Sequence, residues 1–144
     1  MNKRKLIIYC DGGSRGNPGP ADSAFVVTES QKVIDRGSKF LGRETNNTAE
    51  YWAVKLAIEW LSQNIKGLGD YGEIIINLDS QLVERQLNKI YKVKNENLRI
   101  INNQIESLII KNKLPVKFIW NYREKNHLAD LLVNTELDKN IISE

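Results

Sequence analysis

The sequence contains a single cysteine, a single histidine and three prolines, and it has no long hydrophobic run. Because Cys10 has no second cysteine to pair with, an internal disulfide is excluded. The apolar stretch near the N-terminus, within MNKRKLIIYC, is too short for a secretion signal or a membrane span. No internal repeat or low-complexity tract indicates an array or a disordered tail. These absences predict a cytoplasmic protein that is not associated with a membrane.

Length and composition predict one domain, residues 1–144. With 144 residues and 41% hydrophobic content, the chain can bury one core but not a second of similar size. The core pattern begins almost at residue 1, so no substrate-binding module is expected before it. The formal net charge of +3 is mildly basic, which permits a polyanionic partner without requiring one.

Hydrophobic spacing predicts an α/β fold of the mixed α+β kind. The first apolar run, at 6–10, is closed by a glycine-rich turn. The next two strands are expected to form a hairpin, so that the first three strands run antiparallel. Strands are predicted at 6–10, 25–28, 33–41, 74–78 and 116–120, and helices at 47–61, 82–90, 96–110 and 126–139. The resulting order is βββαβααβα.

Two of the predicted strands end directly before an aspartate, at Asp11 and at Asp79. Strands separated by a crossover helix tend to be parallel, so we expect these two to lie side by side with their carboxyl ends together. That edge of an open α/β sheet is where ligands bind. The crossover helix is predicted to begin at Asn47 as its N-cap and to end before a loop that contains Gly67 and Gly69.

Four carboxylates, Asp11, Glu50, Asp79 and Asp130, stand near the ends of predicted elements. Taken alone, each has an ordinary explanation: Asp11 as a turn residue, Glu50 as a capping-box partner of Asn47, Asp79 or its neighbour Ser80 as a helix cap, and Asp130 as a charge at a helix start. If they converge, they repel one another and raise one another's pKa unless a cation neutralises them. Oxygen-only ligands suit hard divalent cations, and a pair of such ions can activate water in phosphodiester hydrolysis.

Four sequence blocks, taken in order, carry a resemblance to a known family. They are Asp-Gly-Gly-Ser-x-Gly-Asn-Pro-Gly from Asp11, Thr-Asn-Asn-x-x-Glu ending at Glu50, Asp-Ser-Gln-x-Val from Asp79, and Asn-x-x-Ala-Asp-x-Leu around Asp130. Together they resemble the ribonuclease H type 1 family over about residues 5–138. The chain looks like a short form that lacks the basic protrusion and the catalytic-histidine loop.

The resemblance implies a ribonuclease H-like fold: a five-stranded mixed sheet, three antiparallel strands and then two parallel ones, flanked by helices. It implies an endonuclease that hydrolyses the RNA strand of RNA–DNA hybrids by two-metal-ion catalysis, leaving 3′-hydroxyl and 5′-phosphate ends. Two Mg²⁺ ions per site are implied, with Mn²⁺ as a substitute. The implied partner is the hybrid duplex, with no obligatory protein partner.

The same resemblance assigns residues to the site. The catalytic and metal-binding residues are Asp11, Glu50, Asp79 and Asp130. The substrate contacts are Gly12, Gly13, Ser14, Asn17, Thr45, Asn46, Asn47 and Gln81. Asparagine and glutamine amides suit a ribose 2′-hydroxyl because both groups donate and accept hydrogen bonds, and this hydroxyl distinguishes RNA from DNA.

The chain departs from the family pattern after the last strand. Many members carry a histidine on a mobile loop there, whereas the connection at 121–129 is too short for such a loop. Its His127 is expected inside the final helix, as a partly exposed residue rather than a metal ligand. Arg123 or Glu124 is a candidate for part of the missing role, because each lies beside the helix start.

The segment at the place of the basic protrusion, 89–95, is also short. Lys89, Lys92 and Lys94 are the candidate phosphate contacts in it. With so few cations, the salt dependence of binding is expected to be modest rather than steep.

Two other functions stay open from the sequence alone. One is a DNA enzyme of the same fold, such as an integrase or a junction resolvase, and the other is a hybrid-binding protein that has lost cleavage. Thr-Asn-Asn before the glutamate and Asp-Ser-Gln at the third acid argue against the first. The presence of all four acids argues against the second.

Several residues that suggest chemistry have a structural interpretation instead. The three tryptophans, Trp52, Trp60 and Trp120, lie on apolar stripes and are expected in the core rather than in base stacking. Cys10 is expected to be a small core residue. The glycine-rich segment at 12–19 lacks the Gly-Lys-Ser/Thr ending of a phosphate loop, so its expected role is to let the backbone approach a substrate closely.

Overall fold

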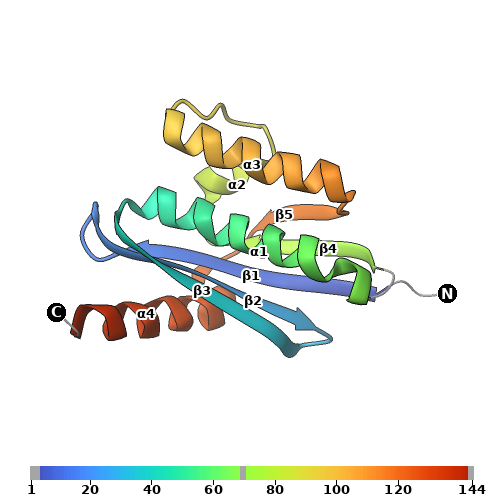
Figure 1. Cartoon of the computed structure of the whole chain (residues 1–144), viewed down its shortest axis with the longest axis horizontal. Helices are drawn as coiled ribbons and strands as arrows, with labels where there is room; N and C mark the ends of the chain where they lie inside the picture. Colours follow the sequence, from blue (N-terminus) through green and yellow to red (C-terminus); the bar gives the residue numbers. More distant parts are fainter. Residues whose placement is uncertain (1–3, 69–70, 143–144) are drawn as a thin grey trace.

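The computed structural model describes residues 4–68 and 71–142, which form one mixed sheet with helices on both faces (Figure 1). The predicted order βββαβααβα is confirmed, with one short 3₁₀ helix added before the last helix. The strands are β1 (Arg4–Ser14), β2 (Gly19–Glu29), β3 (Lys32–Glu44), β4 (Tyr71–Leu78) and β5 (Val116–Trp120). The helices are α1 (Asn46–Leu68), α2 (Gln81–Leu87), α3 (Glu96–Asn112), the 3₁₀ helix η1 (Arg123–Asn126) and α4 (His127–Ile142).

The sheet has the strand order β3-β2-β1-β4-β5. Strands β1, β2 and β3 pair antiparallel, while β4 pairs parallel with both β1 and β5, as predicted. The crossover through α1 therefore brings the carboxyl ends of β1 and β4 to one edge of the sheet. This is the edge at which Asp11 and Asp79 were expected to meet.

Alternating side chains of the strands bury against helices on the two faces. Phe25 and Val27 of β2 belong to the main core beneath α1, whereas Ala24 packs with Val133 and Leu137 of α4 on the other face. Cys10 is fully buried, as predicted, and its thiol donates to the carbonyl of Ala53 at 3.6 Å. Helices α1 and α4 are thus fixed on opposite faces of the strands that end at the candidate site.

Strand β1 is longer than predicted. The residues after Cys10 do not form a turn, because Asp11, Gly12, Gly13 and Ser14 pair with β2. The site therefore begins inside a strand whose pairing with β2 holds the Asp11 backbone more firmly than a turn would.

The start and end of α1 also differ from the prediction. The amide of Thr48 donates to the Thr45 hydroxyl at 3.2 Å, so Thr45 is the capping residue and Asn47 lies inside the first turn. The helix runs past 61 to Leu68 and includes Gly67, while Gly69 lies outside the described residues. The predicted capping box of Asn47 with Glu50 is therefore wrong, which leaves the Glu50 carboxylate available for other partners.

The three tryptophans are only partly buried, although core positions were predicted for them. The rings of Trp52 and Trp60 pack at the margin of the main core. The Trp60 indole donates to Asp35 at 2.6 Å, and the Trp120 indole donates to the carbonyl of Asp79 at 3.3 Å.

Among the helices of the described residues, none is long and apolar enough to cross a membrane.

One acid outside the candidate site is buried without a partner. Asp22 of β2 is fully buried, and neither of its carboxylate oxygens has a hydrogen-bond partner within the described ranges. Burial, followed by the negative charge of Glu136 on α4, raises the pKa of Asp22 to about 7. Its folded-state pKa is therefore higher than the value of 3.8 expected for an unfolded chain.

We expect Asp22→Asn to stabilise the protein more at pH 8 than at pH 5, by about 2 kcal/mol. Between the two pKa values the folded state holds more protons than the unfolded state, so the parent loses stability as the pH rises. The amide is neutral at every pH and escapes this loss. Urea unfolding of both proteins at the two pH values, with exposed Glu124→Gln as the control, measures the effect. A gain that is equal at pH 5 and pH 8 would contradict the assignment.

Candidate metal centre

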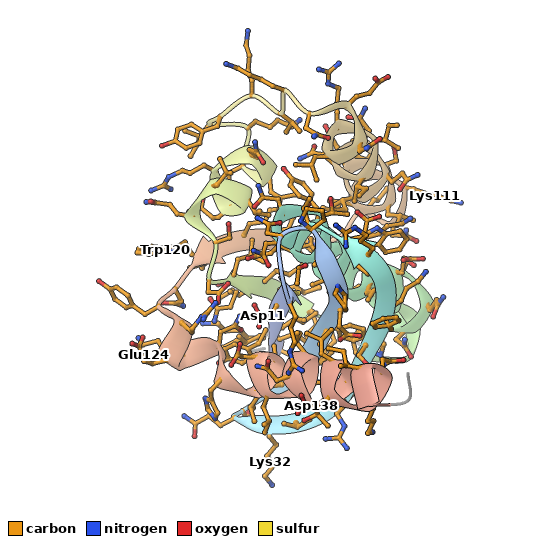
Figure 2. All side chains as sticks on the ribbon, turned by 90° about the vertical axis from the view of Figure 1, so that its left-hand side faces the viewer. Asp11, Lys32, Lys111, Trp120, Glu124 and Asp138 are labelled. Atoms are coloured by element: carbon orange, nitrogen blue, oxygen red, sulfur yellow. The ribbon has the colours of Figure 1, made fainter. Side chains whose placement is uncertain are left out.

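Three carboxylates from three elements converge at one end of the sheet. One oxygen from each of Asp11, Glu50 and Asp79 lies within 4.8 Å of the others. Asp11 is in β1, Glu50 is in the first turns of α1, and Asp79 follows β4 directly. Figure 2 looks onto this end of the molecule, with Asp11 near its middle. The parallel pairing of β1 with β4 and the packing of α1 on β1 produce this convergence.

Asp130 approaches the same place from α4. It lines a cavity of about 360 Å³ together with Asp11 and Glu50, and it forms a side-chain hydrogen bond with Asp11. Asp130 is not one of the three carboxylates whose oxygens lie within 4.8 Å of one another. All four predicted acids are therefore brought to one region, three in a tight group and the fourth at its side.

The surroundings of this cluster disfavour negative charge. Burial, then the charge of Asp79, then the hydrogen bond and charge of Asp130 raise the pKa of Asp11 to about 8. Burial and the charges of Asp79 and Asp11 raise the pKa of Glu50 well above its ordinary value. Burial also raises the pKa of Asp79, although Arg123 opposes this shift. The positive charge near these carboxylates is therefore too small to offset their negative charges.

Arg123 supplies only part of that charge. Its Nε donates to a carboxylate oxygen of Asp79 at 3.4 Å, but the Arg123 side chain is 76% exposed, whereas the Asp79 side chain is 6% exposed. One carboxylate oxygen of Glu50, Oε2, is buried and has no hydrogen-bond partner among the residues that the structure describes. An all-oxygen set with an unsatisfied buried carboxylate oxygen suits a hard divalent cation, so the residues present fit a metal.

The backbone around the cluster is held by hydrogen bonds. Ser80 caps α2, because its hydroxyl accepts from the amide of Val83 at 3.2 Å. The predicted alternative of Asp79 as the cap is therefore not used, and its carboxylate faces the cluster. On α1, the Ser23 hydroxyl donates to the carbonyl of Ala49 at 2.5 Å, one residue before Glu50.

Asn126 is a positioning residue that the sequence reasoning did not assign. It is 1% exposed, and its amide donates to the carbonyl of Cys10 at 2.7 Å. This bond ties the start of α4 to β1 directly beside Asp11, and Asp130 follows one helical turn later. The signal was present in the sequence, because Asn126 opens the Asn-x-x-Ala-Asp block.

The predicted substrate-contact residues fall into two groups. Those that line the cavity are Gly12, Gly13, Ser14 and Asn46. Those that do not line it are Asn17, Thr45, Asn47 and Gln81, all of which are exposed.

Four of these side chains already have structural partners, namely those of Ser14, Asn17, Thr45 and Asn46. The Asn46 side-chain oxygen accepts from the amide of Ser14 at 2.8 Å, and the amide of Asn46 donates to the Asn17 side chain at 3.1 Å. These bonds fix the start of α1 to the end of β1. The side chains of Asn47 and Gln81 are exposed and form no hydrogen bond among the described residues.

The residues that depart from the family pattern are also placed. His127 is the exposed first residue of α4, as expected, and Glu124 is exposed with its side chain pointing away from Asp11 (Figure 2). Of the two candidates for the missing role, only Arg123 contacts the cluster. In the segment between α2 and α3, Lys89 is paired with Glu106 at 2.6 Å, which leaves Lys92 and Lys94 as its exposed cations.

The chain is similar to known proteins over most of its length. The sequence model of the RNase H family matches residues 3–138. Ribonuclease HI of Halobacterium salinarum is 35% identical over 138 residues, which cover 93% of this chain and 65% of that protein. The bifunctional protein Rv2228c of Mycobacterium tuberculosis is 36% identical over 136 residues, which cover 93% of this chain and 36% of that protein. The chain therefore spans only part of the length of these relatives.

Solved structures give the same result. LC11-RNase H1, isolated from compost, has a TM-score of 0.88 and 39% identity, covering 98% of this chain and 99% of its own. The same enzyme in complex with an RNA/DNA hybrid has a TM-score of 0.88 and 38% identity, covering 94% of this chain and 99% of its own. The fold and the family inferred from the sequence blocks are confirmed.

Proposed function

The chain belongs to the RNase H family, and from this premise we propose that it hydrolyses the RNA strand of RNA–DNA hybrids, leaving 3′-hydroxyl and 5′-phosphate ends. The observation that carries the proposal is the convergence of Asp11, Glu50 and Asp79, with one oxygen of each within 4.8 Å of the others. The solved complex of LC11-RNase H1 with an RNA/DNA hybrid supports the choice of substrate.

The proposed cofactor is a pair of Mg²⁺ ions, for which Mn²⁺ substitutes. Asp11, Glu50 and Asp79 would hold them, with Asp130 at the side of the group. When bound, such ions supply an activated water and stabilise charge on the leaving oxygen. Because magnesium keeps several waters and takes few carboxylates, this small acid set leaves room for a phosphate oxygen.

The chain's own groups position the substrate in this proposal. Hydrogen bonds through Asn17 and Asn46 join the end of β1 to the start of α1. These two segments form a fixed surface beside the acids. Exposed Asn47 and Gln81 present amides that can donate to and accept from a ribose 2′-hydroxyl. DNA lacks this hydroxyl, so the amides would favour RNA without adding charge to an already acidic site.

A cleavage assay tests the proposal directly. End-labelled RNA–DNA hybrid, double-stranded RNA and DNA duplex of one sequence are incubated with the protein and Mg²⁺, then with EDTA. We expect cutting of the RNA strand of the hybrid alone, and none in EDTA. Cutting of the DNA duplex would support a DNA enzyme of the same fold, and binding of an uncut hybrid would support a binding module.

Arg123 provides a second test of the site. We expect Arg123→Ala to lower turnover about tenfold, because it removes the cation that offsets the charge of Asp79. Glu124→Ala, a neighbouring substitution at an exposed side chain, should stay within about twofold of the parent. Steady-state cleavage of a labelled hybrid at saturating Mg²⁺ measures both. Parental turnover in Arg123→Ala would remove this residue from the proposed mechanism.

A further inference from the structure

We propose that Lys39, Trp52 and Lys55 form a second contact for the phosphate backbone of the hybrid, outside the metal centre. We call these three residues the lysine–tryptophan clamp. The inference rests on the proposed function, since it extends the surface that the same duplex would occupy. It adds residues from the middle of β3 and the second and third turns of α1, which the sequence blocks do not include.

The geometry of the clamp is specific. The ammonium nitrogens of Lys39 and Lys55 lie 4.4 Å and 4.3 Å from the centroid of the Trp52 ring. The indole packs at the margin of the main core, so it is a fixed platform for both side chains. Cation–π contacts of this length hold flexible lysine side chains in place and lower the entropy lost when they bind an anion.

The two positive charges of the clamp are not neutralised. Within the described ranges, no ion pair joins Lys39 or Lys55 to a carboxylate. Glu44 lines a cavity of about 280 Å³ beside Trp52 and Lys55, yet it pairs with neither lysine. Two unpaired ammonium groups held on one ring repel each other, and a phosphate bound beside them would relieve that repulsion.

The clamp lies within reach of a duplex at the metal centre. Lys55 follows Asn46 by nine residues along α1, which is about 13 Å at 1.5 Å per residue. Thr48, Trp52 and Lys55 line one cavity together with Glu44 of β3 and residues of α3. A backbone that crosses the start of α1 would therefore meet the clamp.

The neighbouring surface fits a polyanion better than a protein partner. The cavity beside the ring is also lined by the amides of Asn97 and Gln104 from α3, which can donate to phosphate oxygens. Aliphatic side chains occur there only as Ile100 and Ile101. Charge, amide donors and an aromatic ring together are typical of a nucleic-acid contact.

The test is the salt dependence of hybrid binding. Lys39→Ala/Lys55→Ala is compared with its parent, both carrying Asp11→Asn so that the RNA stays intact. Binding of a fluorescent hybrid is measured by anisotropy over about 0.05 to 0.3 M KCl. Loss of two phosphate contacts should weaken binding about five- to tenfold at 0.1 M salt and make the slope of log K against log salt shallower by about 1.5.

A matched control separates this local effect from net charge. Lys32→Ala/Lys111→Ala removes the same charge at positions that lie far from Asp11 in Figure 2, and it should leave the slope unchanged. An equal slope in the clamp variant and the parent would overturn the inference and leave Lys39 and Lys55 as supports of Trp52. If a parent with Asp11 intact neither binds nor cuts the hybrid, the proposed function fails and the clamp fails with it. If the hybrid is cut but the clamp variant and its parent have the same slope of log K against log salt, only the clamp proposal is wrong.

Discussion

Asp11→Asn is expected to lower turnover by about 10³-fold or more while making the metal-free protein more stable. The two effects have one cause, because Asp11 lies at the centre of a group of buried, mutually repelling carboxylates. An amide keeps the shape of the side chain but is a poor ligand for a hard cation. Turnover falls because the metal is bound less well, and stability rises because one of the repelling charges is removed.

The stability change has a defined pH dependence. Burial and the neighbouring acids raise the pKa of Asp11 to about 8 in the folded protein, against 3.8 for an unperturbed aspartate. The folded state therefore holds the extra proton between these values, and the metal-free parent loses stability as the pH rises. Asparagine does not titrate, so the gain should be small near pH 4 and rise to several kcal/mol above pH 8.

Magnesium should reverse the order of stability. A cation that binds only the folded state raises the melting temperature of the parent. The variant has one fewer ligand and should respond less. Thermal unfolding in EDTA and in millimolar Mg²⁺ at pH 8 gives both comparisons, and a cleavage assay gives turnover.

The control for this prediction is Asp35→Asn, an exposed acid of β3 whose replacement can still accept from the Trp60 indole. It should leave both turnover and the metal response near those of the parent. Near-parental activity in Asp11→Asn would refute the site, and an unchanged melting temperature with Mg²⁺ would refute a preformed metal centre.

The sequence was sufficient to predict which strands meet at the site. Apolar runs that end at Asp11 and Asp79, with a helix between them, allow few arrangements once crossover handedness is considered. The structure has these strands as parallel neighbours. The four blocks added the family, because together they are far more specific than any single acid.

The start of α1 shows what local sequence cannot decide. Thr45, Asn46 and Asn47 are all good capping residues, so a single helix pattern fits several starts. The bond from the Asn46 amide to Asn17, 29 residues away in sequence, helps to select Thr45 as the cap. Similarly, the Trp52 ring contacts Lys39, which comes from another element and which local sequence does not identify.

The glycines of the first sequence block also show what local sequence cannot decide. Gly12 and Gly13 were expected to let the backbone approach a substrate, and nothing in the sequence separates the two. In the structure their surroundings differ sharply. A Cβ added at Gly12 would lie 2.2 Å from the backbone carbon and oxygen of Ala49, whereas one at Gly13 would lie 3.7 Å from a methyl of Val133.

Gly12→Ala is therefore expected to destabilise the protein by about 3 to 5 kcal/mol and to abolish turnover. The clash is with the backbone of α1, which cannot rotate away as a side chain would. Relief requires α1 to move from β1, and this movement would carry Glu50, the residue after Ala49, away from Asp11. Loss of stability and loss of the acid cluster thus follow from one displaced helix.

Gly13→Ala is the matched control, because the same methyl group meets only an ordinary van der Waals distance one residue later. We expect it to change the free energy of unfolding in urea by less than about 1 kcal/mol. If Gly12→Ala does not fold, the same substitution can be made in the Asp11→Asn variant. The greater stability expected of that variant allows the loss of unfolding free energy to be measured. Equal stability of the Gly12 and Gly13 variants would show that α1 does not depend on this contact. Glu50 would then be placed by other means, and the close packing of α1 on β1 could not explain the geometry of the cluster.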